Sequence, residues 1–115
     1  MKQSANDFLP LAPAVLHILL ALAGEDMHGY GIMQDVARQS EGRYKLGPGT
    51  LYDNLQRLLK QKIVELVGED EEDSRRRYYR LTPLGRRILS AEILRLEGVV
   101  REARLHLPLP QTGRC

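Results

Sequence analysis

The chain has 115 residues, of which 43% are hydrophobic and 28% are charged, a composition typical of one globular domain rather than a disordered chain. This length allows a modest core and excludes a large catalytic cleft. The formal net charge of +2 says little about binding partners, so the distribution of charge along the chain carries more information.

Cysteine content and hydropathy bear on the location of the protein. The single cysteine, Cys115, cannot form an intrachain disulfide, which agrees with a reducing cytoplasm. The apolar run 8–23 is interrupted by two prolines and His17 and is too short to span a bilayer. We therefore expect a cytoplasmic protein with neither a signal peptide nor a membrane anchor.

Two helices are predicted in the first 40 residues, after a loose polar arm at residues 1–8. The first covers 11–23, where Pro13 is tolerated in the first turn and aliphatic residues supply a buried side. His17 lies in this apolar run, and we expect a partly buried histidine with a hydrogen-bond partner rather than a metal ligand. The second helix opens with the sequence HGYGI at 28–32 and should end near Ser40.

The third predicted helix covers 48–61, with Gly47 as N-cap and Pro48 at the first helical position. Leucines at helical spacing mark one buried stripe: Leu51, Leu55, Leu58 and Leu59. The opposite side is polar and mostly basic, with Thr50, Asp53, Asn54, Arg57, Lys60 and Gln61. The second and third helices are joined by a short basic link, and the third has a polar side, so the pair fits a helix-turn-helix. An ordinary amphipathic helix would show the same leucine stripe and is the alternative.

A β-hairpin is predicted next, with strands at 63–67 and 75–81 and a polar tip between them. Its position directly behind the polar helix makes it the wing of a winged helix-turn-helix. Charge is segregated here: 43–62 holds five basic residues against Asp53 alone, and 74–87 holds six arginines and no acid. Such segregation predicts a cationic surface for nucleic acid. The acids of the tip are expected to be a solvated loop, with autoinhibition or a metal site as alternatives.

The last predicted helix starts at Thr82-Pro83, an N-cap followed by proline, and runs to about 105. Apolar residues recur along it at spacings that alternate between four and three, which is a heptad seam: Leu89, Ile93, Leu96, Val100, Ala103 and Leu107. A small winged domain cannot cover so long a helix, so a second subunit is expected to do so. We divide the chain into a DNA-binding domain at 1–82, a dimerisation helix at 83–107 and a flexible tail at 108–115.

These patterns predict an α+β, mainly α fold: a winged helix-turn-helix with a long C-terminal dimerisation helix. The sequences HGYGI at 28–32, GTLYDNLQRL at 49–58 and RRRYYRLTPLGR at 75–86 resemble the PadR-like transcriptional regulators in order and spacing. The resemblance covers roughly residues 11–103, and the three motifs together are specific. It implies a homodimer that binds double-stranded operator DNA, most often as a repressor, and a short member with one C-terminal helix.

The resemblance also implies which residues meet DNA. It places the recognition helix on 48–61 and the wing arginines at Arg75 and Arg76. From the residue types, Asn54 and Arg57 are the expected base readers, because Asn pairs with adenine and Arg with guanine through two hydrogen bonds each. The full expected set is Lys45, Pro48, Gly49, Thr50, Tyr52, Asn54, Arg57, Lys60, Arg75 and Arg76. Relatives often carry Ser or Thr before the Pro-Gly pair, whereas Gly47 offers no side-chain cap here.

Other function classes find little support in the sequence. It contains no metalloprotease motif, phosphate-binding loop or nucleophile elbow, so we predict no enzyme, no catalytic residue, no metal and no cofactor. The main alternative is a winged helix used for protein–protein contacts. A metal-responsive repressor that uses Cys115, His106 and the acids of the tip is a weaker one. A small-molecule effector is expected, but the sequence does not identify it, the operator or the regulated gene.

Overall fold

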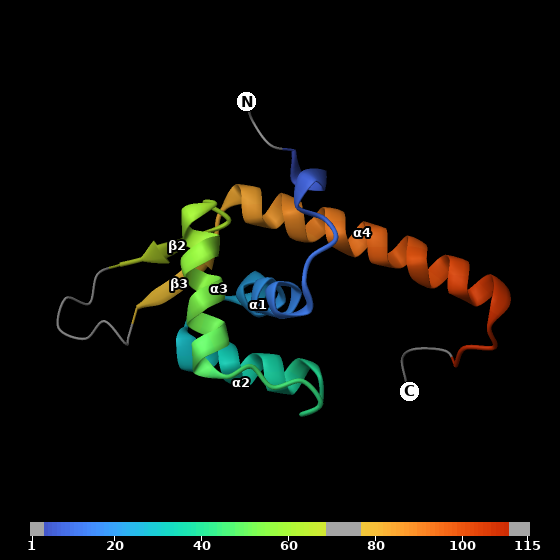
Figure 1. The fold of residues 1–115 in the computed structure, drawn as a ribbon, viewed down its shortest axis with the longest axis horizontal. Helices are drawn as coiled ribbons and strands as arrows, with labels where there is room; N and C mark the ends of the chain where they lie inside the picture. Colours follow the sequence, from blue (N-terminus) through green and yellow to red (C-terminus); the bar gives the residue numbers. More distant parts are fainter. Residues whose placement is uncertain (1–3, 69–76, 111–115) are drawn as a thin grey trace.

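The structure is a computed structural model that describes residues 4–68 and 77–110. Its elements are η1 (Ala5–Phe8), α1 (Pro13–Gly24), β1 (Met27–His28), α2 (Gly29–Gln39), α3 (Pro48–Lys60), β2 (Val64–Val67), β3 (Tyr78–Leu81) and α4 (Pro83–His106). Figure 1 shows α1, α2 and α3 gathered beside the first half of α4, while the second half of α4 projects away from them. The predicted α+β, mainly α class is confirmed, with a winged helix-turn-helix formed by α1 to β3.

The helices begin close to where their local signals place them. Thr82 caps α4, because its Oγ1 accepts a hydrogen bond from the backbone N–H of Gly85 at 3.0 Å. Gly47 is the N-cap of α3 and makes no side-chain cap bond, as its lack of a side chain requires. α1 starts at Pro13 rather than at residue 11, because a residue before proline avoids the helical conformation and Ala12 is extended.

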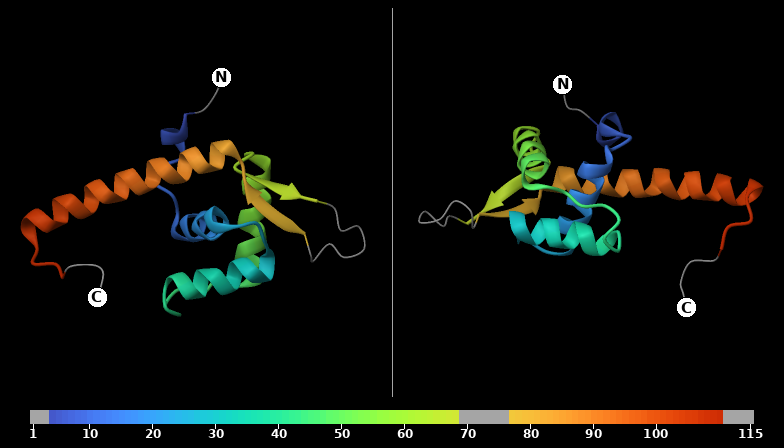
Figure 2. Two further views of the ribbon diagram at one scale, coloured as in Figure 1. Left: turned by 180° about the vertical axis from the view of Figure 1, so that it is seen from behind. Right: turned by 60° about the horizontal axis from the view of Figure 1, so that its bottom comes forward.

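One core joins every helix of the winged domain. α4 contributes only from its first half, where Gly85, Ile88, Leu89 and Glu92 are its buried residues. The other helices, the sheet and the segments on either side of α3 supply the rest: Ile18, Leu19, Ala21, Leu22, Ile32, Val36, Leu46, Leu51, Leu55, Leu58, Ile63, Val64, Tyr79 and Leu81. The start of α4 is therefore part of the domain, and the remainder of the helix extends beyond it (Figure 2).

The expectation of a loose arm at 1–8 is wrong for the part that the structure describes. Ala5–Phe8 form a turn of 3-10 helix, and Ala5 and Phe8 pack against the core. Beyond this turn, the backbone N–H of Leu11 donates to the Glu92 carboxylate of α4 at 3.0 Å. Apolar side chains and one buried carboxylate thus hold the segment against α4.

The sheet has three antiparallel strands in the order β1-β3-β2. β1 was not predicted, and it pairs Met27 with Tyr79 and His28 with Tyr78. Side chains of β3 alternate as expected, since Tyr79 and Leu81 are buried while Tyr78 and Arg80 are exposed. The tip of the hairpin, 69–76, lies outside the described residues, so the predicted role of its acids is not tested.

A tight joint connects the hairpin to α4. The backbone N–H of Thr82 donates to the Ile63 carbonyl at 3.1 Å, and the Thr82 hydroxyl lies 2.6 Å from the Lys62 carbonyl. Gly85 closes the joint, because a Cβ atom at this position would overlap the Ile63 carbonyl oxygen. Glycine is therefore required here for close packing rather than for an unusual backbone angle.

Candidate nucleic-acid interface

The outward side of α3 is set by the three leucines on its inner side. Leu51, Leu55 and Leu58 are buried in the core. At about 100° per residue, Asp53, Gln56 and Lys60 lie roughly 130–175° from the mean direction of these leucines, so they form the outermost line of the helix. All three are exposed, as are Pro48, Gly49 and Thr50 in the first turn. The outermost line therefore carries hydrogen-bonding groups and no large apolar side chain.

Of the expected base readers, Asn54 lies on one flank of α3, and Arg57 lies between that flank and the outermost line, about 125° from the buried direction. Asn54 is only about 60° from the buried direction at helical spacing, and it is half-buried. Its Nδ2 donates to the Thr50 carbonyl of the same helix at 2.9 Å. Both side chains border a hollow of about 160 Å³ that is also lined by Pro10 and Leu11. Arg57 is exposed and remains free to extend, whereas the Asn54 amide already has one partner inside the protein.

Tyr52 lies on the opposite flank and connects α3 to α2. Its ring rests against the start of α2, where a Cβ atom added to Gly29 would overlap the Tyr52 hydroxyl. The side chain remains 40% exposed, so its ring serves packing and its surface is still open. Nearby, burial raises the pKa of the Tyr79 hydroxyl, with a smaller contribution from Tyr52. Gly29 of the HGYGI motif is thus the residue that lets α2 and α3 approach each other.

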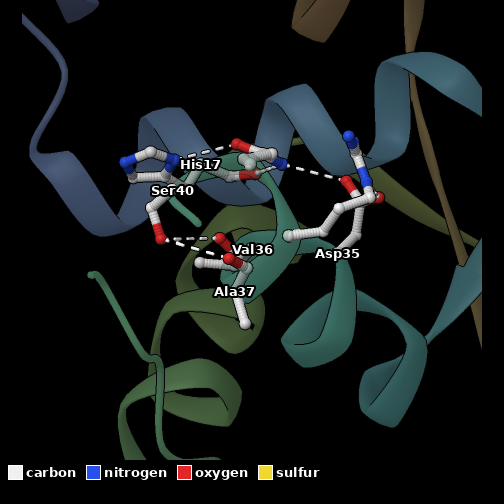
Figure 3. A network of polar contacts seen from close by, with 7 residues as sticks. His17, Asp35, Val36, Ala37 and Ser40 are labelled. Atoms are coloured by element: carbon white, nitrogen blue, oxygen red, sulfur yellow. Dashed lines mark hydrogen bonds and ion pairs between the residues drawn. The ribbon is translucent and has the colours of Figure 1, made fainter. Parts of the chain in front are cut away.

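A network of polar contacts fixes the angle between α1 and α2 (Figure 3). The Gln39 amide donates from Nε2 to the His17 carbonyl at 3.1 Å and to Asp35 at 3.0 Å. Its Oε1 must therefore accept from His17 Nδ1, 2.8 Å away, so that nitrogen carries the hydrogen. The hydrogen bond from Arg38 lowers the pKa of the Asp35 carboxyl; burial opposes this, and the Gln39 hydrogen bond adds to the lowering. The expectation of a partnered histidine at 17 is confirmed.

The same network reaches the turn that leads into α3. The His17 ring stacks on Tyr44, with ring centroids 4.9 Å apart. Ser40 Oγ accepts from the Tyr44 backbone N–H at 2.9 Å, and it lies within hydrogen-bonding distance of the Val36 and Ala37 carbonyls (Figure 3). α1, α2 and the turn that leads into α3 are therefore held by one continuous set of contacts.

The root of the hairpin is joined to the segment just before α2 by an aromatic contact and an ion pair. His28 is the N-cap of α2, and its Nδ1 accepts from the Gly31 backbone N–H at 3.0 Å. Its ring meets the edge of Tyr78, with centroids 5.4 Å apart. On the same strand, Arg80 Nη2 lies 3.0 Å from Asp26 Oδ2. These contacts set the direction in which the hairpin leaves the domain.

Other predicted residues fall in different places. Lys45 is exposed in the turn before α3, and Lys60 is exposed at its end. Arg75 and Arg76 lie outside the described residues, as does Cys115. Sequence reasoning missed Gln56, which lies on the outermost line of α3. The signal was present, because residue 56 is three positions after Asp53 and five after Leu51, which places it opposite the leucines.

The predicted dimerisation residues divide into two groups. Leu89 is only 7% exposed and belongs to the domain core. Ile93, Leu96 and Val100 border a surface hollow of about 380 Å³ on the projecting part of α4, and Ala103 follows one turn later, half-buried. Val100 is 44% exposed.

Within residues 4–68 and 77–110, no group of three His, Cys, Asp or Glu side chains is arranged to hold a metal ion. The same stretches include no helix with both the length and the apolar character needed to cross a bilayer.

Comparisons with known proteins agree with this geometry. Residues 15–91 match the family model described as Transcriptional regulator PadR-like family. The transcriptional regulator Rv3488 of Mycobacterium tuberculosis is 36% identical over 87 residues, which are 76% of this chain and 78% of that protein. A transcriptional regulator from Clostridium thermocellum has a TM-score of 0.69 at 26% identity, covering 82% of this chain and 89% of that one. A PadR family regulator from Clostridium difficile has a TM-score of 0.68 at 22% identity, covering 82% and 97%.

Proposed function

This chain belongs to the PadR-like family of transcriptional regulators, and we propose that it is a cytoplasmic, dimeric repressor that binds operator DNA and is released by a small-molecule effector. Family membership confirms the resemblance of the three motifs and makes the chain a DNA-binding transcription regulator rather than an enzyme. The operator, the repressor role, the dimer and the effector are the parts that we propose beyond this.

The observation that carries the operator proposal is the outward side of α3. Its first turn and its outermost line present Gly49, Thr50, Gln56 and Lys60 to solvent, over a fully buried leucine stripe. A helix with this distribution can enter the major groove with its amide-rich start near phosphate and its side chains on base edges. Thr50 and Tyr52 would position the helix on the DNA backbone, and Arg57 and Gln56 would contact bases. The wing arginines Arg75 and Arg76 would add phosphate or minor-groove contacts.

Support for a dimer comes from the projecting half of α4. All of its buried residues lie in the first half, and large apolar side chains beyond them are exposed, including Val99, Val100, Leu105 and Leu107. Exposed apolar surface of this kind commonly marks a contact with another protein. A second copy would cover Ile93, Leu96, Val100 and Ala103, whereas Leu89 already packs within its own subunit.

The two-fold axis of such a dimer suggests how an effector would act. Each α3 would contact half of a pseudo-palindrome, with half-site centres about one helical turn, roughly 34 Å, apart. An effector that changed the angle between the two α4 helices would change this separation. Affinity for the operator would then fall although no residue that contacts DNA had changed.

The test is a selection of bound duplexes from a genomic library, followed by affinity measurements at several salt concentrations. We expect pseudo-palindromic sites and an affinity that falls steeply with salt. Lys60→Gln should weaken binding to every sequence. Arg104→Gln, which removes the same charge from the far end of α4, should not. Absence of both sequence preference and salt dependence would contradict the proposal and favour the winged helix as a protein–protein interaction module.

A further inference from the structure

Asp53 is the only acidic residue between Arg43 and Lys62, a stretch with five basic residues. We propose that Asp53 is a specificity-determining residue that accepts a hydrogen bond from the N4 amino group of a cytosine in each operator half-site. This inference rests on the proposed function, in which α3 enters the major groove.

The position of Asp53 on α3 is the first support. It lies about 200° from Leu51 around the helix and one turn after Gly49, so its direction is nearly opposite to the buried stripe. The side chain is exposed, and its neighbours on the outermost line are Gln56 and Lys60. In a helix-turn-helix, residues in the first half of the second helix come closest to base edges. Asp53 is in that half and Lys60 is not.

The second support is that the Asp53 carboxylate has no hydrogen-bond or ion-pair partner in the part of the chain that the structure describes. Three other carboxylates of the domain each face an arginine: Asp26 with Arg80, Asp35 with Arg38, and Glu92 with Arg95. Among the residues that the structure describes, none donates a hydrogen bond to the Asp53 carboxylate or pairs with it.

Arg57 has the i, i+4 spacing that favours an ion pair with Asp53. It lines the hollow beside Pro10 and Leu11 on the flank instead. With respect to residues 4–68 and 77–110, the acceptors of the Asp53 carboxylate are therefore unoccupied and available to a base.

The chemistry of the major groove then selects the base. A carboxylate only accepts hydrogen bonds. Guanine presents the two acceptors N7 and O6, thymine presents O4, and adenine places its N7 acceptor beside the N6 donor. Cytosine presents the N4 donor and no acceptor of its own in the major groove, so it is the base that a carboxylate at this position favours.

The same charge disfavours other sequences. Near a duplex, an unpaired carboxylate is repelled by phosphates and by base acceptors, so it weakens every complex in which no amino group faces it. Discrimination of this kind combines one favourable contact with repulsion against the alternatives. A single acid among basic residues would therefore lower non-specific affinity more than affinity for the operator.

The experiment measures base preference at every operator position for wild type, Asp53→Asn, Asp53→Glu and Glu25→Gln, at one salt concentration. Each single base-pair substitution of the selected operator is assayed for binding. We expect wild type to prefer cytosine about tenfold or more at one position in each half-site. Asparagine, which pairs with adenine, should replace that preference with adenine and strengthen binding to unrelated DNA. Asp53→Glu should retain cytosine. The Glu25→Gln control removes an exposed acid outside α3 and should match wild type.

The outcomes separate this inference from the proposed function. A wild-type protein without sequence-selective binding would overturn both. Selective binding by wild type with an unchanged base profile in Asp53→Asn would overturn only the role of Asp53. If Asp53→Asn bound all sequences more tightly by the same factor and kept the base preference of wild type, Asp53 would act through its charge alone, and its role in reading cytosine would likewise be overturned. Circular dichroism of each variant would establish that the exposed substitutions leave the fold intact.

Discussion

Replacing Glu92 by glutamine removes a buried negative charge that joins the N-terminal segment to α4. The side chain is 1% exposed and accepts from the Leu11 N–H at 3.0 Å and from Arg95 Nε and Nη2 at 2.6 and 3.0 Å. Glutamine keeps the volume but puts an NH₂ donor where one acceptor was, so at least one bond is lost. Hydrogen bonds to charged groups contribute about 1.5–3 kcal/mol, against about 0.5–1.5 for neutral ones, so we expect a loss of about 2 kcal/mol.

The dependence of this loss on pH follows from the pKa of Glu92. The hydrogen bond from Arg95 holds the pKa of the carboxyl below its ordinary value of 4.5, burial opposes this, and the Leu11 N–H adds to the lowering. The pKa of Glu92 is lower in the folded protein than in the unfolded chain, so its negative charge stabilises the fold. This stabilisation is complete above the unfolded-state pKa and is lost as the pH falls through the folded-state pKa. The difference between wild type and Glu92→Gln should be complete at pH 7 and shrink below pH 4.5.

Urea unfolding followed by circular dichroism at one protein concentration would measure the effect, since a dimer makes stability concentration-dependent. Glu97→Gln is the matched control, because Glu97 is exposed on the same helix and should change little. A Glu92→Gln protein as stable as wild type at pH 7, or a difference that persists unchanged in acid, would refute the reasoning.

Four further predictions concern the dimer, the DNA contacts and the packing of α3. Leu96→Glu places a charge in the apolar seam of α4, so sedimentation should show a monomer or an unfolded chain, and a well-folded dimer would count against the interface. Arg57→Ala should relax preference at particular operator positions by about 1–3 kcal/mol, whereas uniform weakening on all sequences would make Arg57 a phosphate contact. Arg75→Ala, outside the described residues, should make the log–log salt slope shallower by roughly two, because a dimer loses two phosphate contacts; an unchanged slope would mean that the wing stays off the DNA. Gly29→Ala puts a methyl group where the Tyr52 hydroxyl lies and should lower the free energy of unfolding by about 1–3 kcal/mol. That loss should largely disappear in a Tyr52→Ala background, and its persistence there would show that another contact is responsible.

The helices could be predicted from the sequence because the signals that start and stop them are local. Thr82-Pro83 and Gly47-Pro48 define two helix starts without reference to any other part of the chain. β1 has no such signal, since Met27 and His28 become a strand only by pairing with Tyr79 and Tyr78, about fifty residues away. The same holds for Ala5–Phe8, which pack against the core and α4.

The candidate site was predictable to the level of the helix and less well at single residues. The leucine stripe sets the orientation of α3. The polar residues of this helix do not all lie opposite the leucines, however, and Asn54, which was expected there, lies on the flank. Glu92 was missed because glutamates on helices are normally solvated, and its burial depends on a segment 81 residues earlier that packs over it. Contacts of this kind depend on tertiary structure and leave no local pattern.

Histidine rings hold the two ends of α2 in opposite ways. At the C-terminal end, His17 of α1 donates from Nδ1 to the amide oxygen of Gln39. At the N-terminal end, His28 accepts at Nδ1 from the Gly31 N–H and takes the place of the side-chain oxygen that usually caps a helix. The two rings are therefore opposite tautomers, and α2 depends on a side-chain donor at residue 17 and on a side-chain acceptor at residue 28.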